Sequence, residues 1–463
     1  MNFKNEVLAF AVSLLGLALF IAFSLYAVPG LDNITIGILG LCFLFILFLM
    51  GMPVGLALIA ASIVFIAQLR GIDAACFVGS RAIFSTAGSY AWSPLMFFML
   101  MGYLCYYGNF GKDIFTCARN WLGHLRGGLA MVSIFACTLF GAVVGDVLSG
   151  SIAMAAIALP EMRKYKYDDT LAVGTLACSG TIGCLIPPST TFIIYGVLAQ
   201  QSIGDLFISG IVPGILCMFC FMLAVWIMSL FKPDLAPKLP KVPLGERITS
   251  LKAGLPVLFI FIVVIGGIYG GVFTATEGGG IGVCGTILLA LLMRRLTWQG
   301  FLNAMKDSAK FISMCFTVLC GAVVLSYFMA LTSIPTELAN TIASLEVSGG
   351  LVLFMIILVF VILGCFLPSM PMLLICVPIF VPIANVFNWD LIWFGVLIVI
   401  LDNMASITPP FGINLFVMKE VAGVSLGTMY KSAIPFVIAL FLCLFIVILF
   451  PELATFLPNL MRG

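Results

Sequence analysis

Long apolar runs without a charged residue constrain this sequence more than any other feature. Four of them are Leu8–Val28, Ile211–Phe231, Val257–Tyr269 and Phe436–Phe450. A helix needs about 20 mostly apolar residues to cross about 30 Å of hydrocarbon, and several runs reach that length. They do not alternate apolar with polar residues, which argues against a transmembrane β-barrel. We therefore expect an all-α polytopic protein embedded in a lipid bilayer.

The composition supports this class and excludes others. Hydrophobic residues make up 63% of the chain and charged residues only 9%, whereas a soluble domain is about 25% charged. A net charge of +2 without a basic block gives no reason to expect nucleic acid as a partner. The 15 cysteines occur singly in apolar runs and His124 is the only histidine, so we expect buried reduced thiols and no site for a transition metal.

Turn residues divide the chain into helical spans. The apolar runs predict single spans at 6–29, 31–51, 53–69, 91–109, 205–231, 253–271, 275–296, 311–334 and 430–456. The first run lacks an A-x-A cleavage site, so we expect it to be a retained helix and not a signal peptide. The connector 232–252 holds five basic and two acidic residues and is expected in the cytoplasm. That placement puts the N-terminus in the cytoplasm and the C-terminus on the periplasmic side, although Arg70 and Arg81 fit it less well.

Two further apolar segments, 168–198 and 390–420, are interrupted by polar residues. The first contains CSGTIGCLIPPSTTFIIY at Cys178–Tyr195, and the second contains LDNMASITPPFGINLF at Leu401–Phe416. Each interruption combines glycine, hydroxyl side chains and a double proline, which removes backbone donors from a helix. We expect two broken helices that face one site.

The two halves of the chain repeat one plan. Three pairs of landmarks have the same spacing in sequence, which we call the repeat interval: Pro187 and Pro409, Asp168 and Asp390, and Pro213 and Pro435. The halves are 31–231 and 253–460, joined by the connector 232–252 and preceded by an additional helix within 1–30. An odd number of crossings between equivalent points predicts inverted repeats, and inverted repeats with discontinuous helices are typical of secondary transporters.

A segment with short apolar arms precedes each broken helix. Residues 125–165 have the polar interruption GDVLSGS and residues 347–387 have GCFLPSMP, with Gly145 corresponding to Gly364. Arms of about 15 residues are short for two crossings and favour re-entrant hairpins. Irregular backbone at membrane depth persists only where protein or a water-filled cavity satisfies it, so each tip is expected to meet the following broken helix. Interfacial helices are expected before both hairpins, around CARNWLGHLRGG and TSIPTELANTIASL.

These loops offer oxygen ligands for a hard cation. An unwound helix frees carbonyl oxygens, which suit Na⁺, while freed amides at helix N-termini favour an anion. Hydroxyl groups add further oxygens at Ser149, Ser151, Ser179, Thr181, Ser189 and Thr190. One site of this kind can hold a cation together with an anionic substrate.

The alternative is that small residues and prolines here only kink helices and permit close packing. Asp146 and Asp402 are the best candidates for functional intramembrane charges, but helix caps or ion pairs are the structural alternatives. Glu277 is expected to cap the helix that begins beside it. A solvated amphipathic connector is expected at Lys306, Asp307 and Lys310.

Taken together, these motifs resemble the large membrane (M) subunit of TRAP transporters, the tripartite ATP-independent periplasmic family. The matching stretches are GMPVGLAL at Gly51–Leu58, GDVLSGSIA at Gly145–Ala153, GTIGCLIPPST at Gly180–Thr190, GVFTATEGGG at Gly271–Gly280 and LDNMASITPPFGINLFV at Leu401–Val417. The resemblance covers roughly residues 38–460. It implies a Na⁺-coupled importer of the bacterial inner membrane with an elevator mechanism, in which a scaffold holds a moving transport domain. It also implies a small membrane (Q) subunit and a periplasmic binding protein that delivers an organic anion.

By position, the resemblance implies about two Na⁺ ions and no organic cofactor. The first Na⁺ would lie among Ser149, Gly150, Ser151, Gly183, Ile186 and Pro188. The second would lie among Leu367, Ser369, Asp402, Thr408 and Pro410. Substrate would be met by Asp146, Ser151, Thr190 and Thr191. Two departures are the additional helix in 1–30 and the second tip, where LPSMP replaces a Ser-Gly-Ser sequence.

Other function classes remain as alternatives. A stand-alone elevator symporter for divalent anions would share the hairpins and broken helices but need no binding protein. An intramembrane enzyme requires a nucleophile and base or a metal cluster, which a single histidine at an interface does not supply. A channel is disfavoured because no ring of charge is apparent. The transported anion itself is not determined by the sequence.

Overall fold

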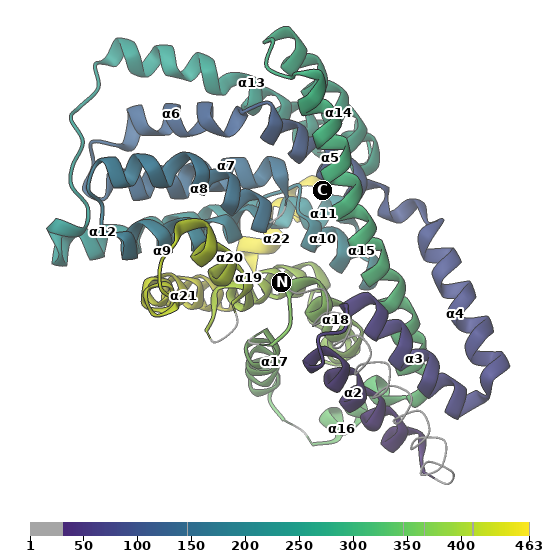
Figure 1. Cartoon of the computed structure of the whole chain (residues 1–463). Helices are drawn as coiled ribbons and strands as arrows, with labels where there is room; N and C mark the ends of the chain where they lie inside the picture. The colour runs from purple at the N-terminus through teal and green to yellow at the C-terminus, as the bar shows by residue number, and fades with distance from the viewer. Residues whose placement is uncertain (1–30, 146, 346, 365, 410–411, 463) are drawn as a thin grey trace, which may run out of the picture. The chain divides into compact units, whose positions relative to one another are not determined.

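The structure, a computed structural model, describes residues 31–145, 147–345, 347–364, 366–409 and 412–462 (Figure 1). Throughout these residues the regular structure is helical, without a β-strand. This confirms the expectation of an all-α polytopic protein. The helix predicted at 6–29 lies outside the described residues.

The first half of the described chain begins with helices that were expected as single spans, and then reaches the first hairpin and broken helix. Its elements are α2 Asn33–Leu49, α3 Val54–Arg70, α4 Ile72–Ala87, η1 Tyr90–Trp92, α5 Ser93–Tyr107, α6 Phe110–Leu122, α7 Gly128–Val144, α8 Val147–Lys164, α9 Asp169–Ser179, η2 Gly180–Cys184, α10 Thr190–Leu198, α11 Ile203–Ser209, α12 Ile211–Phe231 and η3 Pro233–Leu235.

The second half follows the same order of long helices, hairpin and broken helix. Its elements are α13 Leu244–Tyr269, α14 Ala275–Leu292, α15 Trp298–Thr332, α16 Ile334–Ser344, α17 Gly349–Gly364, α18 Ser369–Val386, α19 Leu391–Ile407, α20 Ile413–Ala422, α21 Leu426–Leu449 and α22 Glu452–Arg462. Five of the described stretches are long and apolar enough to cross a membrane: Ile203–Phe231, Ala275–Leu292, Trp298–Thr332, Ser369–Val386 and Leu426–Leu449. Ser369–Val386 belongs to the segment expected as a hairpin with arms too short to cross, and at 18 residues it is longer than predicted.

Three segments differ from their sequence-based expectation. The sequence predicted no span over residues 72–87, because Asp73 and Arg81 interrupt the apolar run, whereas the structure has helix α4 there. The expected connector at residues 306–310 lies inside the 35-residue helix α15, where Asp307 accepts a 2.5 Å hydrogen bond from the Tyr107 hydroxyl. Helix α13 begins at Leu244, within the segment expected as a linker.

The described chain divides into two compact units. One holds residues 31–90, 310–353 and 374–388, and the other holds 91–309, 354–373 and 389–462. In the first unit, α3 and the second half of α15 cross at glycines. A Cβ on Gly55 would stand 2.6 Å from the backbone of Thr317, and a Cβ on Gly321 would stand 2.6 Å from the Gly55 carbonyl. Small residues therefore bring these two backbones together, as they do in other membrane bundles.

The second unit contains both broken helices and their caps. Asp168 caps α9 by accepting from the Thr170 amide, and Asp390 caps α19 by accepting from the amides of Ile392 and Trp393. These two aspartates, one repeat interval apart in sequence, perform the same structural task. A carboxylate at a helix N-terminus also complements the helix dipole.

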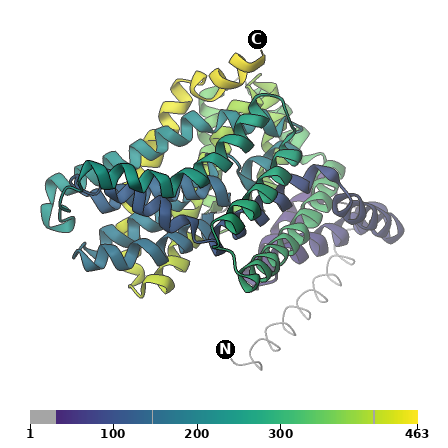
Figure 2. The ribbon, with the colours of Figure 1, turned by 90° about the horizontal axis from the view of Figure 1, so that it is seen from above.

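Helices α12 and α21, which follow the two broken helices, pack against each other in this unit. Phe221 and Phe436 meet with ring centroids 5.1 Å apart, and the Cys443 thiol lies 3.8 Å from the Pro213 carbonyl oxygen. The C-terminal helix α22 packs on α11 and α12 and is the yellow helix that leads to the C-terminus in Figure 2. All the described residues of the predicted site also lie in this second unit.

Candidate functional site

The first hairpin turns at Gly145. Helices α7 and α8 lie side by side, and Gly145 ends α7 with a left-handed φ of +71°. That backbone region is open to glycine but rarely to other residues. A Cβ at this position would also stand 2.8 Å from the Pro188 carbonyl oxygen. The tip therefore needs glycine both for its turn and for its approach to the broken helix. Asp146, the next residue, lies outside the described residues.

The first broken helix stops at Ser179 and resumes at Thr190. A 3₁₀ turn and the two prolines fill the interval, because proline supplies no amide donor to continue an α-helix. The Ser189 side chain accepts from the Phe192 amide and so caps the second half, α10. The hairpin tip is fixed to this restart: the Gly145 carbonyl accepts from the Thr190 hydroxyl at 3.0 Å and from its amide at 3.3 Å.

Behind the tip, hairpin and broken helix touch backbone to backbone. A Cβ on Gly141 of α7 would stand 2.6 Å from the Gly183 Cα. In the second repeat, a Cβ on Gly364 of α17 would meet Ala405 of α19. Gly183 and Ala405 are again one repeat interval apart in sequence. Both hairpins therefore approach their broken helices at positions one repeat interval apart. On the hairpin side, however, the contact of Gly364 is matched by that of Gly141 and not by that of Gly145, with which the sequence comparison paired it.

Ser151 connects the first hairpin to the second repeat. It is fully buried on α8, and Gly180 approaches its side chain so closely that no Cβ would fit there. Its Oγ accepts a 3.0 Å hydrogen bond from the amide Nδ2 of Asn414 on α20. The same nitrogen donates to the Ala177 carbonyl, on the last turn of α9. One buried amide thus holds the hairpin and both broken helices together.

The two broken helices also meet through Thr191 and Asp402. The Thr191 hydroxyl donates to Asp402 Oδ2 at 3.3 Å, and the Asp402 side chain is 1% exposed. Asp402 Oδ1 is buried without a hydrogen bond from the residues that the structure describes. An uncompensated buried carboxylate oxygen is costly, so this atom is available to a ligand.

Hydroxyl groups gather where the second hairpin meets α19. Ser369, the first residue of α18, has its Oγ 2.9 Å from that of Ser406, and the Ser406 hydroxyl lies 3.1 Å from the Asp402 carbonyl oxygen. The Thr408 hydroxyl donates to the Met404 carbonyl at 2.6 Å. Leu367 is buried at the same turn, whereas Pro410 lies outside the described residues.

The remaining predicted residues lie around the first tip. Ser149 and Gly150 are in the first turns of α8, and a Cβ on Gly150 would come no nearer than 4.0 Å to Gly141. Ile186 is buried, and its side chain fills the space beside Gly214. The structure therefore places the described residues of the first predicted set near the first hairpin and first break, and those of the second set near the second hairpin and second break.

Sequence reasoning missed Asn414 and Asn403. Both are fully buried amides, and neither Asn403 side-chain atom has a hydrogen bond from the described residues. The signal was present as single asparagines in otherwise apolar helices, beside the quoted double proline. Their roles depend on contacts between distant segments, which the local pattern does not contain.

The chemistry of this region favours a hard cation. The polar atoms that it offers are carbonyl oxygens, hydroxyls and one carboxylate, the oxygen donors that alkali and alkaline-earth ions prefer. Among the described residues, no group of three or more His, Cys, Asp or Glu side chains could hold a metal. Helices α10 and α20 both begin at the breaks, and helix N-termini attract anions.

Comparison with known proteins shows which family this chain resembles. The family model described as "Tripartite ATP-independent periplasmic transporter, DctM component" matches residues 41–453. The sialic acid TRAP transporter large permease protein SiaM of Vibrio cholerae is 31% identical over 416 residues, covering 89% of this chain and 96% of SiaM. The C4-dicarboxylate TRAP transporter large permease protein DctM of Pseudomonas aeruginosa is 32% identical, covering 81% of this chain and 88% of that protein.

Solved structures share the fold at low sequence identity. The Alcanivorax borkumensis YdaH transporter superposes with a TM-score of 0.60 at 12% identity, covering 84% of this chain and 90% of that chain. The curated relatives are named as permeases, which agrees with the expectation that the chain is not an enzyme.

Proposed function

Because the chain belongs to the DctM-component family of tripartite ATP-independent periplasmic transporters, we propose that it imports a small organic anion together with Na⁺. The relatives named for sialic acid and for C4-dicarboxylates both act on carboxylates, and a carboxylate or a sulfonate is the substrate class proposed here. The chain would act in the bacterial inner membrane with two further components. These are a small membrane subunit and a periplasmic binding protein that delivers the anion.

The contact between Thr191 and Asp402 is the observation that carries this proposal. It joins the two broken helices beside both hairpin tips, and it leaves Asp402 Oδ1 unpaired among the described residues. A Na⁺ ion would neutralise this carboxylate, so that cation binding and closure of the second tip through Ser369 and Ser406 favour each other. Binding that favours one state shifts the population toward it.

We assign the first Na⁺ to carbonyl and hydroxyl oxygens at the first tip and first break. Its proposed ligands are Ser149, Gly150, Ser151, Gly183, Ile186 and Pro188. We assign the second Na⁺ to the second tip and second break. Its proposed ligands are Leu367, Ser369, Asp402, Thr408 and Pro410. The anion would then meet the N-terminal end of α10 and the residues Asp146, Ser151, Thr190 and Thr191.

Movement of the site is proposed to follow an elevator mechanism. All the described site residues belong to one compact unit, so a single rigid body could carry both ions and the anion. Because the bound ions hold the hairpin tips against the broken helices, this body would move most readily when it is either fully loaded or empty. That condition couples uptake of the anion to the Na⁺ gradient.

The test is reconstitution in liposomes with the small membrane subunit and the binding protein of the same transporter. We expect uptake of labelled anion to require an inward Na⁺ gradient and all three components. Equal uptake with choline in place of Na⁺ would show that anion transport is not coupled to Na⁺. Uptake by the large subunit alone would favour a stand-alone divalent-anion symporter. The anion itself can be found beforehand as the compound that raises the melting temperature of the binding protein.

A further inference from the structure

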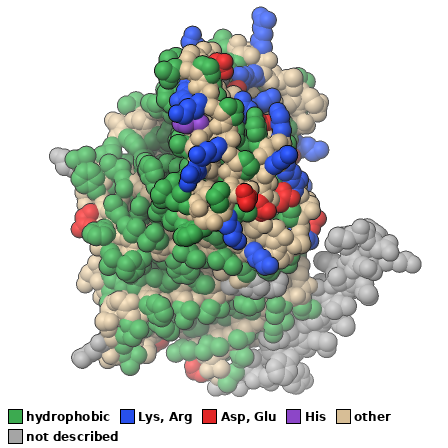
Figure 3. Space-filling model, turned by 90° about the vertical axis from the view of Figure 1, so that its left-hand side faces the viewer, with side chains coloured by type: hydrophobic (Ala, Val, Ile, Leu, Met, Phe, Trp, Pro, Cys, Tyr) green, Lys and Arg blue, Asp and Glu red, His purple; other side chains and the backbone are tan. Residues whose placement is uncertain are grey.

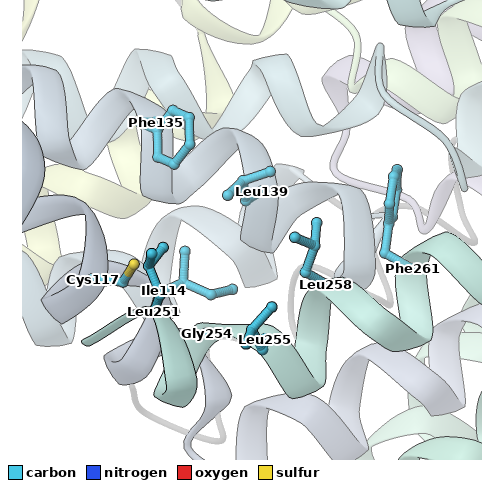
Figure 4. Close-up of a pocket in the computed structure, with 9 residues that line it drawn as sticks. All are labelled: Ile114, Cys117, Phe135, Leu139, Leu251, Gly254, Leu255, Leu258 and Phe261. Atoms are coloured by element: carbon cyan, nitrogen blue, oxygen red, sulfur yellow. The ribbon is translucent and has the colours of Figure 1, made fainter. Parts of the chain in front are cut away.

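Helices α6, α7 and α13 enclose an apolar hollow far from the broken helices in sequence. Its volume is about 160 Å³ and no charged side chain lines it (Figure 4). Gly254 leaves room on α13, since a Cβ there would meet only Cys117, at an ordinary 3.7 Å. The other lining residues are Ile114, Cys117, Phe135, Leu139, Leu251, Leu255, Leu258 and Phe261. We call this hollow the α6–α13 groove.

The groove opens on an exposed apolar surface of α13. Leu251, Leu255 and Leu258 line it and yet remain 40%, 54% and 42% exposed. The stretch of α13 from residue 251 to residue 261 follows a path of roughly 15 Å at 1.5 Å per residue, with a bend of 49° next to Pro256. That length is half of the roughly 30 Å hydrocarbon thickness. The groove is therefore about as long as one leaflet of the hydrocarbon region is thick.

Basic side chains stand at one end of the groove. Arg247 lies one turn before Leu251 on α13, and Lys252 follows that residue. Neither forms an ion pair with another described residue, although Arg247 Nε donates a 2.9 Å hydrogen bond to the Val242 carbonyl oxygen. Glu246 is the one acid in this part of α13. Figure 3, which looks at the left-hand side of Figure 1, shows Lys and Arg side chains gathered beside a broad hydrophobic area. The Trp121 indole donates to the Arg247 carbonyl at 3.2 Å, and tryptophan is typical of the membrane interface.

We propose that one acyl chain of an anionic phospholipid occupies the α6–α13 groove, with its phosphate at Arg247 and Lys252. The apolar lining excludes a polar ligand. A hollow of about 160 Å³ is too small for a helix about 10 Å across, whereas it can take part of a single acyl chain. Basic residues without an acidic partner next to a membrane attract anionic headgroups. The lipid would fill the space between α6 and α13 and hold both against the first hairpin.

Fluorescence of Trp121 tests the proposal on the full-length protein. The protein is placed in nanodiscs of phosphatidylcholine that contain increasing fractions of phosphatidylglycerol with brominated chains. Bromine quenches only nearby indoles, and Trp121→Phe identifies the part of the signal that belongs to this residue. We expect the quenching of Trp121 to saturate at a low fraction of brominated phosphatidylglycerol. The fraction of brominated phosphatidylcholine needed for the same quenching should be roughly tenfold higher.

Two matched variants separate the groove from bulk lipid. Gly254→Leu fills the groove, whereas Gly266→Leu makes the same change at an exposed position of α13 with no atom within 4 Å. We expect the saturable quenching to disappear only with Gly254→Leu. Arg247→Gln combined with Lys252→Gln should bring the preference for phosphatidylglycerol close to one.

Native mass spectrometry of the detergent-purified protein gives a second measurement. We expect one phosphatidylglycerol fewer on Gly254→Leu than on the wild type or Gly266→Leu, while all three melt as single folded species. Equal lipid retention, or quenching that changes alike in both glycine variants, would overturn the proposal. The proposal would also be overturned if brominated phosphatidylglycerol and brominated phosphatidylcholine quenched Trp121 of the wild type at the same lipid fraction. A second protein retained on the wild-type chain in place of lipid would also contradict it.

Discussion

Replacing Gly141 by alanine should separate the first hairpin from the first broken helix. The added Cβ would stand 2.6 Å from the Gly183 Cα, against 3.4 Å for ordinary contact, so the two backbones must part by about 0.8 Å. Both sides of this contact are backbone, and no side chain can rotate away. A shift of that size would stretch the two Thr190 bonds to the Gly145 carbonyl, now 3.0 and 3.3 Å, past the roughly 3.5 Å at which hydrogen bonds fail.

The expected loss of unfolding free energy is the sum of the overpacking and of the two broken hydrogen bonds. Overpacking costs about 1–3 kcal/mol, and each lost hydrogen bond costs about 0.5–1.5 kcal/mol, which together give about 2–6 kcal/mol. Unfolding entropy of about 2.1 cal/mol/K per residue over 463 residues converts this into a melting temperature lowered by roughly 2–6 °C. Anion uptake should fall as well, because the tip no longer closes on the break.

The assay is thermal unfolding followed by intrinsic fluorescence, together with Na⁺-driven uptake in liposomes. Gly285→Ala in the middle of α14 is the matched control, because a Cβ there would meet no atom within 4 Å and the residue lies outside the proposed site. Both changes add the same methyl group to a helix, so the general gain of alanine over glycine cancels in the comparison. Gly141→Ala with the same melting temperature and uptake as Gly285→Ala would show that the two backbones do not meet as described.

Two further predictions concern buried polar groups. Asn414→Leu should lower the free energy of unfolding by about 1–3 kcal/mol, because it leaves Ser151 Oγ and the Ala177 carbonyl without their donor. Asn403→Leu, equally buried but with no amide partner among the described residues, should melt at or above the wild-type temperature, and equal losses in both would contradict the assigned role of Asn414. Asp402→Asn should raise the half-saturating Na⁺ concentration for uptake by about tenfold, equivalent to about 1.4 kcal/mol. An unchanged Na⁺ dependence would remove Asp402 from the ion site.

Much of the fold could be predicted because membrane insertion leaves a strong local signal in the sequence. Charge-free runs indicate helices, and proline pairs indicate breaks, since the backbone in hydrocarbon must either be helical or be satisfied by protein. The repeat interval correctly paired Asp168 with Asp390, and both cap the helices that they open. The turn at Gly145 was likewise indicated by its glycine.

Other elements could not be read in this way. Helix α4 carries charge and is amphipathic, so a test for apolar runs misses it. The basic residues near 306–310 suggested a connector, yet Lys306 and Lys310 are exposed on a helix that continues through them. The asparagine at position 414 was visible in the sequence, but its role was not, because its partner Ser151 lies 263 residues earlier. Contacts of that range depend on tertiary packing and not on periodicity.

The bond between Asn414 and Ser151 has a consequence for how the protein is made. At about 5–20 residues per second, the ribosome needs roughly 13–50 s to travel the 263 residues between these two side chains. During that time the first hairpin is already synthesised, but the amide that Ser151 and the Ala177 carbonyl require does not yet exist. The first half must therefore wait in the membrane in an incomplete form, shielded by water or by the insertion machinery. Completion of the first hairpin is thus a late step of biogenesis, set by arrival of the C-terminal quarter of the chain.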